Sequence, residues 1–454
     1  MGKPYIRKHA GRYALLAGLL LAAGCKNHGS EAQGAGPAPA GVAAPSAGGA
    51  ITLNVIDAAG TLQLVQDAME AYRTKRPGKV DKFTYTKAPA PELPGKLKAM
   101  QGAGRMDIDL VLGGTDILAA GIEQGLWTPI LPDHADVFPH VIDNYTDQAR
   151  EMQKLAQDQA LAVVFMPAGP LIEYNPDTVK SPPTTPAELL AWCKDHKDRF
   201  IYARPANSGP GRTFLMGLPY LLGDKDPKDP MKGWDKTWAY LKELDSCIEY
   251  YPSGTSATMK EFGEGSRDMT VTVTGWDKTW AFLKQLDACI EYYPSGTGAT
   301  MKEFGEGSRD MTMTVTGWDI NPRVLGIVPE KYKVAAFNNM TWVNDTQYMI
   351  VPRGLAPERL AVVLDVMAFL LEPAQQAMTF DKGYFYPGPA VKGVTLAMAP
   401  AASQDAIRTF GRREYDDWLA RFPHQRPLEA KAMVAAFRRW DEEVGAQKSQ
   451  KSKQ

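Results

Sequence analysis

Met311-Thr-Met-Thr-Val-Thr316 is a short run rich in β-branched residues, and Gly317-Trp318-Asp319 follows it at once. Such a run is typical of a β-strand, because β-branched side chains fit a pleated sheet. In open α/β sheets, ligands bind outside the carboxyl ends of the strands. An aromatic ring next to a carboxylate at that place suits a cationic or hydroxyl-rich small molecule. The alternative for the same residues is a packed indole beside a helix-capping aspartate.

Strand-like and helix-like segments alternate on both sides of this run. Toward the N-terminus we expect strands at 51–57, 82–86 and 108–112, with helices at 62–72 and 93–100 between them. Further strands are expected at 162–166, 171–175, 200–203, 333–337 and 348–351, and further helices at 186–197, from Thr213 and at 356–371. This order predicts parallel strands with right-handed crossovers. At 454 residues, the chain exceeds what one hydrophobic core usually serves, so two lobes are expected.

Small and polar residues stand where several strands give way to helices. They form the turns Gly60-Thr61, Gly114-Thr115-Asp116 and Asn207-Ser208-Gly209. Backbone N–H groups at the start of a helix lack partners within the helix and are free to meet a ligand. Plain capping by Thr61 and Thr115 is the alternative.

The N-terminus predicts export from the cytoplasm. Four basic residues precede an apolar run at 14–23 that is too short to span a bilayer as a mature helix. The run ends Leu21-Ala-Ala-Gly-Cys25, which resembles a bacterial lipoprotein signal in which Cys25 becomes the lipidated first residue. An ordinary cleaved signal is the alternative. Residues 26–50 are rich in Gly, Ala, Pro and Ser, and they predict a flexible linker.

Composition argues against nucleic acid as a partner. Removal of residues 1–24 leaves 47 basic and 52 acidic residues, a net charge of −5. No basic face is therefore indicated. The apolar fraction of 44% and the charged fraction of 23% are ordinary for a globular protein.

The three cysteines of the expected folded body are Cys193, Cys247 and Cys289. They form no CxxC pattern and no cluster with histidine, so the sequence does not predict a metal site. Export permits a disulfide from Cys193 to either Cys247 or Cys289, with one thiol left over. Buried free thiols are the alternative.

Residues 233–274 and 275–316 are near copies that differ at five positions. Repeat architectures need about three or more units, so two copies indicate a tandem duplication of 42 residues inside an existing lobe. The copies compete for one place in the fold. Only the second copy leads directly into Ile320, so we expect its strand, with Trp318 and Asp319 rather than Trp276 and Asp277, to be the native one.

The order of several motifs over residues 51–445 resembles the periplasmic solute-binding proteins of ABC importers, in the cluster that includes polyamine-binding proteins. The motifs are Tyr174-Asn175, Asn207-Ser208-Gly209, Gly317-Trp318-Asp319, Trp342-Val-Asn-Asp345, Met349-Ile-Val-Pro352 and Phe369-Leu-Leu-Glu-Pro373. The resemblance implies an α/β fold of two lobes (type II-like), with the solute held in the cleft between them and closure about a hinge. We expect one lobe from 51–167 with 336–395, the other from 168–335, helices at 396–446 and a polar tail at 447–454.

The resemblance further implies that the protein delivers a small solute to an inner-membrane ABC permease. It implies a periplasmic monomer without cofactor, metal or enzymatic activity, with a polyamine or other cationic amine as the first choice of solute. The expected ligand-binding residues are Gly60, Thr61, Thr115, Asp116, Tyr174, Asn207, Ser208, Gly209, Trp318, Asp319, Trp342 and Asp345. Trp318 and Asp319 stand where polyamine-binding relatives hold the amine.

Other functions remain open from the sequence. A sugar, thiamine, a phosphonate or ferric ion are alternative solutes on the same fold. An exported hydrolase with paired carboxylates, Asp107 with Asp109 or Asp416 with Asp417, is a more distant alternative. Asp109 is expected to point inward and the second pair to lie on a surface helix, and no catalytic motif accompanies either pair.

Overall fold

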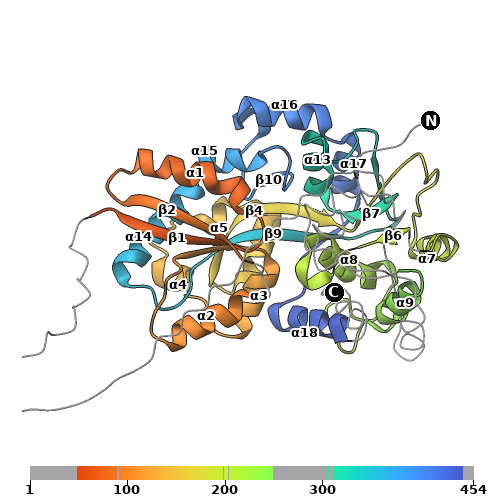
Figure 1. The fold of residues 1–454 in the computed structure, drawn as a ribbon, viewed down its shortest axis with the longest axis horizontal. Helices are drawn as coiled ribbons and strands as arrows, with labels where there is room; N and C mark the ends of the chain where they lie inside the picture. The colour runs from red at the N-terminus through yellow and green to blue at the C-terminus, as the bar shows by residue number, and fades with distance from the viewer. Residues whose placement is uncertain are drawn as a thin grey trace, which may run out of the picture. The chain divides into compact units, whose positions relative to one another are not determined.

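The computed structural model describes residues 49–88, 92–197, 199–202, 204–248, 305 and 310–442. The expected signal segment with Cys25, nearly all of the linker, the polar tail and most of the two repeat copies lie outside these residues. The described chain forms two sheets covered by helices (Figure 1). This is the mixed α/β architecture that the alternation of segments predicts.

The first sheet has the strand order β10-β4-β9-β3-β1-β2, with β11 paired to β9. Its strands are β1 (Ile51–Asp57), β2 (Val80–Lys87), β3 (Leu110–Gly113), β4 (Ala160–Gly169), β9 (Trp342–Ile350), β10 (Gly388–Pro389) and β11 (His424–Gln425). β1 pairs in parallel with β2 and β3, as expected for strands joined through helices. β9 runs antiparallel to both β3 and β4.

The second sheet has the order β6-β7-β5-β8. Its strands are β5 (Leu171–Tyr174), β6 (Phe200–Ile201), β7 (Met311–Thr314) and β8 (Lys333–Ala336). β6 and β7 are parallel, but β5 runs antiparallel to both β7 and β8, so the prediction of a mostly parallel sheet is wrong for this lobe. The chain enters this sheet directly from β4 and returns from β8 to β9 (Figure 1). Every residue of β4 and of β9 is buried, so the two strands that connect the sheets run through the interior.

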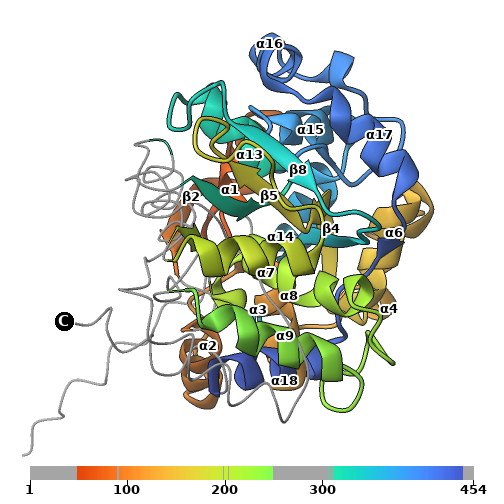
Figure 2. The same cartoon turned by 90° about the vertical axis from the view of Figure 1, so that its right-hand side faces the viewer.

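Helices cover both faces of the sheets. The longer ones are α1 (Leu62–Lys75), α2 (Leu93–Gly102), α3 (Thr115–Glu123), α7 (Pro186–Asp195), α8 (Gly209–Leu221), α9 (Asp235–Asp245), α13 (Thr316–Val324), α14 (Pro357–Leu370), α16 (Ala401–Phe410), α17 (Arg413–Arg421) and α18 (Ala430–Trp440). In the second lobe, α13 lies on one side of β5 and β8, and α7 and α8 lie on the other (Figure 2).

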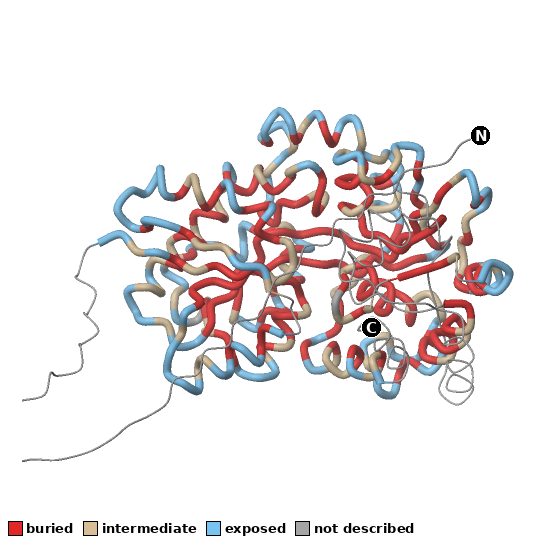
Figure 3. The backbone as a smooth tube through the Cα atoms, viewed as in Figure 1, coloured by how far each residue is buried: buried red, intermediate tan, exposed pale blue. Residues whose placement is uncertain are grey.

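Two apolar cores correspond to the two sheets. The first gathers side chains of β1, β3, β4, α1 and α14, and the second gathers those of β5 to β7, α7 to α9 and α18. Figure 3 shows that burial follows the strands of both sheets, whereas the outer faces of the helices are exposed. Removal of this apolar surface from water is the main favourable contribution to folding.

The two repeat copies contribute different elements to the described fold. The helix α9 comes from the first copy and packs Trp234, Trp238 and Leu241 into the second core. The strand β7 comes from the second copy and lies between β6 and β5. This arrangement is consistent with the expectation that the second copy supplies the strand. The helix α9, however, comes from the first copy.

A disulfide joins Cys193 at the end of α7 to Cys247 just after α9, with the Cα atoms 5.6 Å apart. This is one of the two pairings that the sequence allows. Cys289 lies outside the described residues. Because the bridge ties α9 to α7, it holds the first-copy helix on the second core.

No single helix in the described part of the chain is long and apolar enough to cross a membrane. One bent pair, Pro357–Leu370 with Pro373–Phe380, passes that test together, by length and composition only.

Candidate functional site

The turn that follows β1 is held by a buried carboxylate. Asp57 accepts hydrogen bonds from the backbone N–H groups of Ala59 (3.3 Å) and Gly60 (2.9 Å). Burial raises the pKa of Asp57, and these backbone contacts oppose the rise. Gly60 has a φ of +82°, and a Cβ there would stand 2.3 Å from the hydroxyl oxygen of Tyr384. Only glycine therefore fits beneath this ring.

The turn that follows β3 lies against the turn that follows β1. Gly114 precedes α3, and a Cβ on it would lie 2.9 Å from a carboxylate oxygen of Asp116 and 3.7 Å from the Cβ of Ala59. The hydroxyl of Thr115 donates a hydrogen bond of 2.8 Å to Oδ1 of Asp345 on β9. The carboxyl ends of β1 and β3 thus converge, as parallel neighbours should.

Arg212, in the first turn of α8, reaches this place from the second lobe. Its guanidinium donates to Oδ2 of Asp345 at 2.5 Å and lies 3.3 Å from Oδ2 of Asp116. Burial favours the neutral guanidine, but the two carboxylates outweigh it and raise the pKa of Arg212. We call Thr115, Asp116, Arg212 and Asp345 the Arg212 cluster; it joins α3, α8 and β9.

The two carboxylates of the Arg212 cluster differ in how accessible they are to a ligand. Asp345 uses one oxygen for Arg212 and the other for Thr115 and the N–H of Thr346, and only 2% of its side chain is exposed. Asp116 makes the longer contact with Arg212 and keeps 14% of its side chain exposed. Two carboxylates face one guanidinium, so the cluster carries one excess negative charge when all three groups are ionised.

Trp318 contacts Tyr384, the ring that lies over Gly60. Its half-buried ring meets the Tyr384 ring edge to face at a centroid distance of 4.7 Å. The backbone of Tyr384 presses on the start of α13, because a Cβ on Gly317 would lie 2.2 Å from its carbonyl oxygen. The Tyr384 hydroxyl has no hydrogen-bond partner among the described residues. Trp318 and Tyr384 therefore form an aromatic wall next to the turns of the first lobe.

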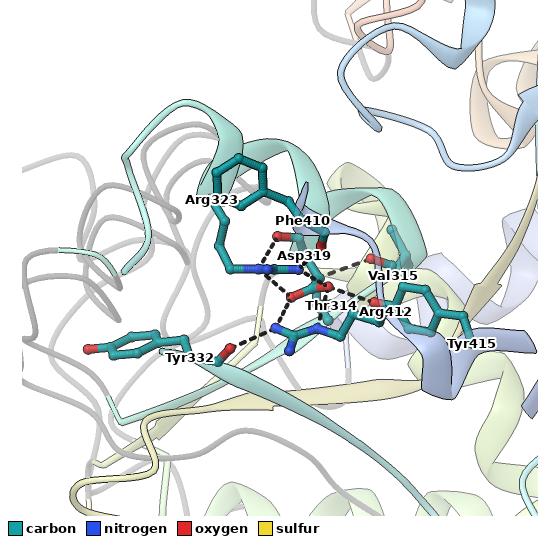
Figure 4. A network of polar contacts seen from close by, with 8 residues as sticks. All are labelled: Thr314, Val315, Asp319, Arg323, Tyr332, Phe410, Arg412 and Tyr415. Atoms are coloured by element: carbon teal, nitrogen blue, oxygen red, sulfur yellow. Dashed lines mark hydrogen bonds and ion pairs between the residues drawn. The ribbon is translucent and has the colours of Figure 1, made fainter. Parts of the chain in front are cut away.

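Asp319 does not share this wall with its neighbour Trp318. Its buried carboxylate receives hydrogen bonds from Arg323 (2.9 Å), Arg412 (2.6 and 2.7 Å) and the hydroxyl of Tyr415 (3.0 Å; Figure 4). Burial alone would raise the pKa of Asp319, but Arg412 and Arg323 lower it. The sequence predicted that Asp319 contacts an amine. In the structure its carboxylate belongs instead to an internal ion cluster, because it already has two cationic partners, Arg323 and Arg412.

Several other expected residues also have structural partners. Trp342 is fully buried, donates its indole N–H to the carbonyl of Trp418 (3.0 Å) and stacks on His424, so it belongs to the core. Thr61 donates to Gln347 at 2.7 Å from a fully buried position. Tyr174 lies at the end of β5 and packs on the second core.

The glycine-rich turn before α8 lies beside the Arg212 cluster. Ser208 caps α8 by accepting from the N–H of Gly211 at 3.2 Å, and a Cβ on Gly209 would lie 3.5 Å from Asp345. Asn207 ends a short 3₁₀ turn, and its side chain is outside the described part of the chain.

The structure thus brings together Gly60, Thr115, Asp116, Ser208, Gly209, Trp318 and Asp345 from the sequence-based set. It places Asp319, Trp342 and Tyr174 elsewhere. Sequence reasoning missed Arg212 and Tyr384. An arginine in the first turn of a helix opposes the helix dipole and normally needs a nearby anion, and this was the available signal for Arg212. Within the described residues, no three His, Cys, Asp or Glu side chains gather in a way that could hold a metal ion.

The chain belongs to a family of bacterial extracellular solute-binding proteins, whose model matches residues 67–276 and 271–409. Proteins of this family bind a small solute for an ABC permease, which places the chain in the periplasm or cell envelope. The two matched stretches meet within the repeat region. None of the curated protein sequences matches this one.

Solved structures share the two-lobed fold at low sequence identity. An ABC transporter protein from Listeria monocytogenes, assigned to spermidine or putrescine, has a TM-score of 0.55 at 12% identity, over 87% of this chain and 98% of that one. A maltose/maltodextrin-binding domain from Bdellovibrio bacteriovorus, bound to maltotriose, has 0.54 at 12%, over 89% and 99%. A periplasmic binding protein from Actinobacillus pleuropneumoniae with bound fructose-6-phosphate has 0.51 at 12%, over 87% and 98%. These likenesses concern the fold and span three classes of solute.

Proposed function

We propose that this solute-binding protein captures a polyamine or another small cationic amine where the aromatic wall of Trp318 and Tyr384 adjoins the Arg212 cluster. The observation that carries the proposal is the excess negative charge of that cluster: Arg212 faces two carboxylates, and Asp116 stays partly exposed. An ammonium group beside an aromatic ring and a carboxylate gains both cation–π and charge-assisted contacts. Release to the permease then requires only that the lobes open.

Three further points accompany this proposal. We infer that Cys25 is lipidated, that the protein acts as a monomer and that it catalyses no reaction. One of the two carboxylate pairs considered for hydrolysis supports the last point, because its Asp109 is buried and paired with Arg359 at 2.6 Å. The charge of Asp109 is therefore engaged in an ion pair within the fold.

The proposal is tested by measuring melting temperature with spermidine, putrescine, thiamine, maltotriose, a phosphonate and ferric ion in turn. A solute that binds only the folded state raises the melting temperature. We expect spermidine or putrescine to give the largest rise. Asp116→Asn should then weaken amine binding at least tenfold, equivalent to about 1.4 kcal/mol.

Glu123→Gln is the matched control, because Glu123 is an exposed carboxylate on the same helix, α3. It should leave the dissociation constant unchanged. An Asp116→Asn protein that binds spermidine as tightly as the wild type would remove Asp116 from the site.

A solute with an acidic group is the second candidate, and Arg212 is the observation that favours it. A phosphonate could replace Asp116 as the second partner of the guanidinium, because arginine forms paired hydrogen bonds with such anions. In this case Asp116→Asn should strengthen binding rather than weaken it. The same variant therefore separates the two candidates by the sign of its effect.

A further inference from the structure

A cavity of about 490 Å³ lies beside β9, and its lining includes Asp147, Glu151, Asn344, His424 and Arg426. Successive side chains of a strand point to opposite faces. Asn344 and Asp345 are adjacent on β9, so the cavity lies on the face of this strand opposite the Arg212 cluster. Its volume is within the range of small-molecule sites.

The two walls of the cavity adjoin different apolar cores. One wall is the helix α6 (Asp147–Gln153), which packs on β4 and β9 and places Ala149 and Met152 in the first core. The other wall is β11 and the residue after it, whose flanking residues Phe422 and Leu428 belong to the second core. A molecule in this cavity would contact segments that adjoin each of the two cores.

The lining carries charges of both signs, carboxylates on α6 and a guanidinium just after β11. Asp147 and Glu151 are one helical turn apart on α6, so both carboxylates project from the same side of the helix, and Glu151 is paired with Lys154. The carboxylate of Asp147 is 91% exposed, and its contact with Arg150 is long, at 3.9 Å. On the other wall, the guanidinium of Arg426 pairs with Glu429 at 3.2 Å and keeps a third of its side chain exposed.

A buried amide completes the site. Asn344 is 3% exposed, and its Oδ1 lies 3.0 Å from Nδ1 of His424. The amide nitrogen of Asn344 has no hydrogen-bond partner among the described residues. If the amide is turned over, the oxygen is left without a partner instead, so one polar atom is left for the cavity in either orientation. Buried polar atoms without a protein partner mark places where a ligand or water completes the hydrogen bonding.

We propose that this cavity is a second binding site, which takes a small zwitterion of the amino-acid class. The ligand carboxylate would meet Arg426 and the Asn344 amide, and the ligand ammonium would meet Asp147 and Glu151. This site is distinct from the one proposed for the transported amine and does not depend on it.

The test is a thermal-shift screen of the twenty free amino acids, one at a time, followed by calorimetry on the best of them. At least one should bind, and its decarboxylated and deaminated analogues should each bind at least tenfold more weakly. Arg426→Gln and Asp147→Asn should each weaken binding at least tenfold. Arg421→Gln, which changes an exposed arginine on the adjacent helix α17, is the control and should have no effect.

Trp318→Ala separates the two sites, because it removes the aromatic wall and leaves the cavity intact. Amino-acid binding should persist in this variant while amine binding falls. The proposal is overturned if no amino acid binds, if Arg426→Gln binds as well as the wild type, or if Trp318→Ala abolishes amino-acid binding.

Discussion

Trp318 and Asp319 are adjacent in the sequence, but their side chains contact different parts of the protein. They lie on α13, where successive residues are rotated by about 100° around the helix axis. The indole therefore meets Tyr384, while the carboxylate turns inward to Arg323 and Arg412. Proximity in a helical sequence does not place two side chains in one site.

At the residue scale, Arg212→Met should destabilise the protein by about 3–5 kcal/mol, because it leaves Asp345 buried without its cation. Urea-induced unfolding measures this change. Adding Asp345→Asn to the variant should recover part of the loss, since the uncompensated charge is then gone. A single variant as stable as the wild type would contradict the role we assign to the Arg212 cluster.

Glu173 supplies a second prediction at this scale. It is fully buried on β5, neither of its carboxyl oxygens has a hydrogen-bond partner in the described chain, and burial together with the charge of Asp319 raises its pKa well above the usual value. The folded state therefore holds a proton that the unfolded state releases above a pKa of about 4.3. The stability gained from this proton is full below that pH and is lost as the pH rises toward the folded pKa.

Glu173→Gln should consequently be more stable than the wild type near neutral pH. The advantage should grow by about 1.4 kcal/mol for each pH unit inside this window. Unfolding free energies measured at pH 4, 5, 6 and 7 test the slope. Parallel curves for the two proteins would show that Glu173 is not protonated in the folded state.

At the element scale, the repeat offers two sequences for the place that α9 occupies. In the second copy, Phe282 replaces Tyr240 and Gln285 replaces Glu243. The first-copy helix therefore has two contacts that the second copy lacks: the hydrogen bond from Tyr240 to the carbonyl of Pro186 and the ion pair between Glu243 and Lys194. The ion pair is exposed and contributes little, whereas the hydrogen bond contributes about 1 kcal/mol.

Deletion of 233–274 should therefore be tolerated. The remaining copy carries the same apolar residues, and Cys289 stands where Cys247 stood. We expect a folded protein with a Cys193–Cys289 disulfide, less stable by about 1 kcal/mol. Peptide mapping identifies the bridge, and chemical unfolding gives the stability. A variant that fails to fold would show that both copies are required.

At the scale of the whole molecule, export and anchoring depend on the N-terminal segment. If Cys25 is lipidated, the full-length protein expressed in a bacterial host should sediment with membranes and enter a detergent phase. Cys25→Ser should stay in the aqueous phase, because a cleaved chain without lipid keeps no anchor. Equal partitioning of the two proteins would contradict lipidation.

Much of the architecture was accessible from the sequence because it depends on local patterns. The strand-helix alternation after residue 51 and the turns at Gly60 and Gly114 all follow from residue type and spacing. The boundaries shifted modestly: the strand expected at 108–112 is Leu110–Gly113, and the strand expected at 200–203 is Phe200–Ile201. The segments from Trp342 and from Tyr348 proved to be parts of one long strand, β9.

The candidate site was only partly accessible. Residues at the carboxyl ends of parallel strands, such as Asp116, could be found because topology alone brings those ends together. Tyr384 could not, since it reaches the site from an element distant in the chain, and for Arg212 the only signal was its place in the first turn of a helix. Trp342 was misassigned because an aromatic motif is equally compatible with a core position, and here its ring and N–H have protein partners.

The sequence by itself determined the class of fold, because apolar periodicity and turn chemistry are local properties of the chain, and the order of its motifs resembled that of the solute-binding family. Tertiary structure alone decided which charges meet. In the folded protein Asp319 pairs with Arg323 and Arg412, Asp345 pairs with Arg212, and Asp116 stays partly exposed. The pairing of buried charges depends on distances between elements far apart in the sequence, and those distances are set only when the sheets and helices pack.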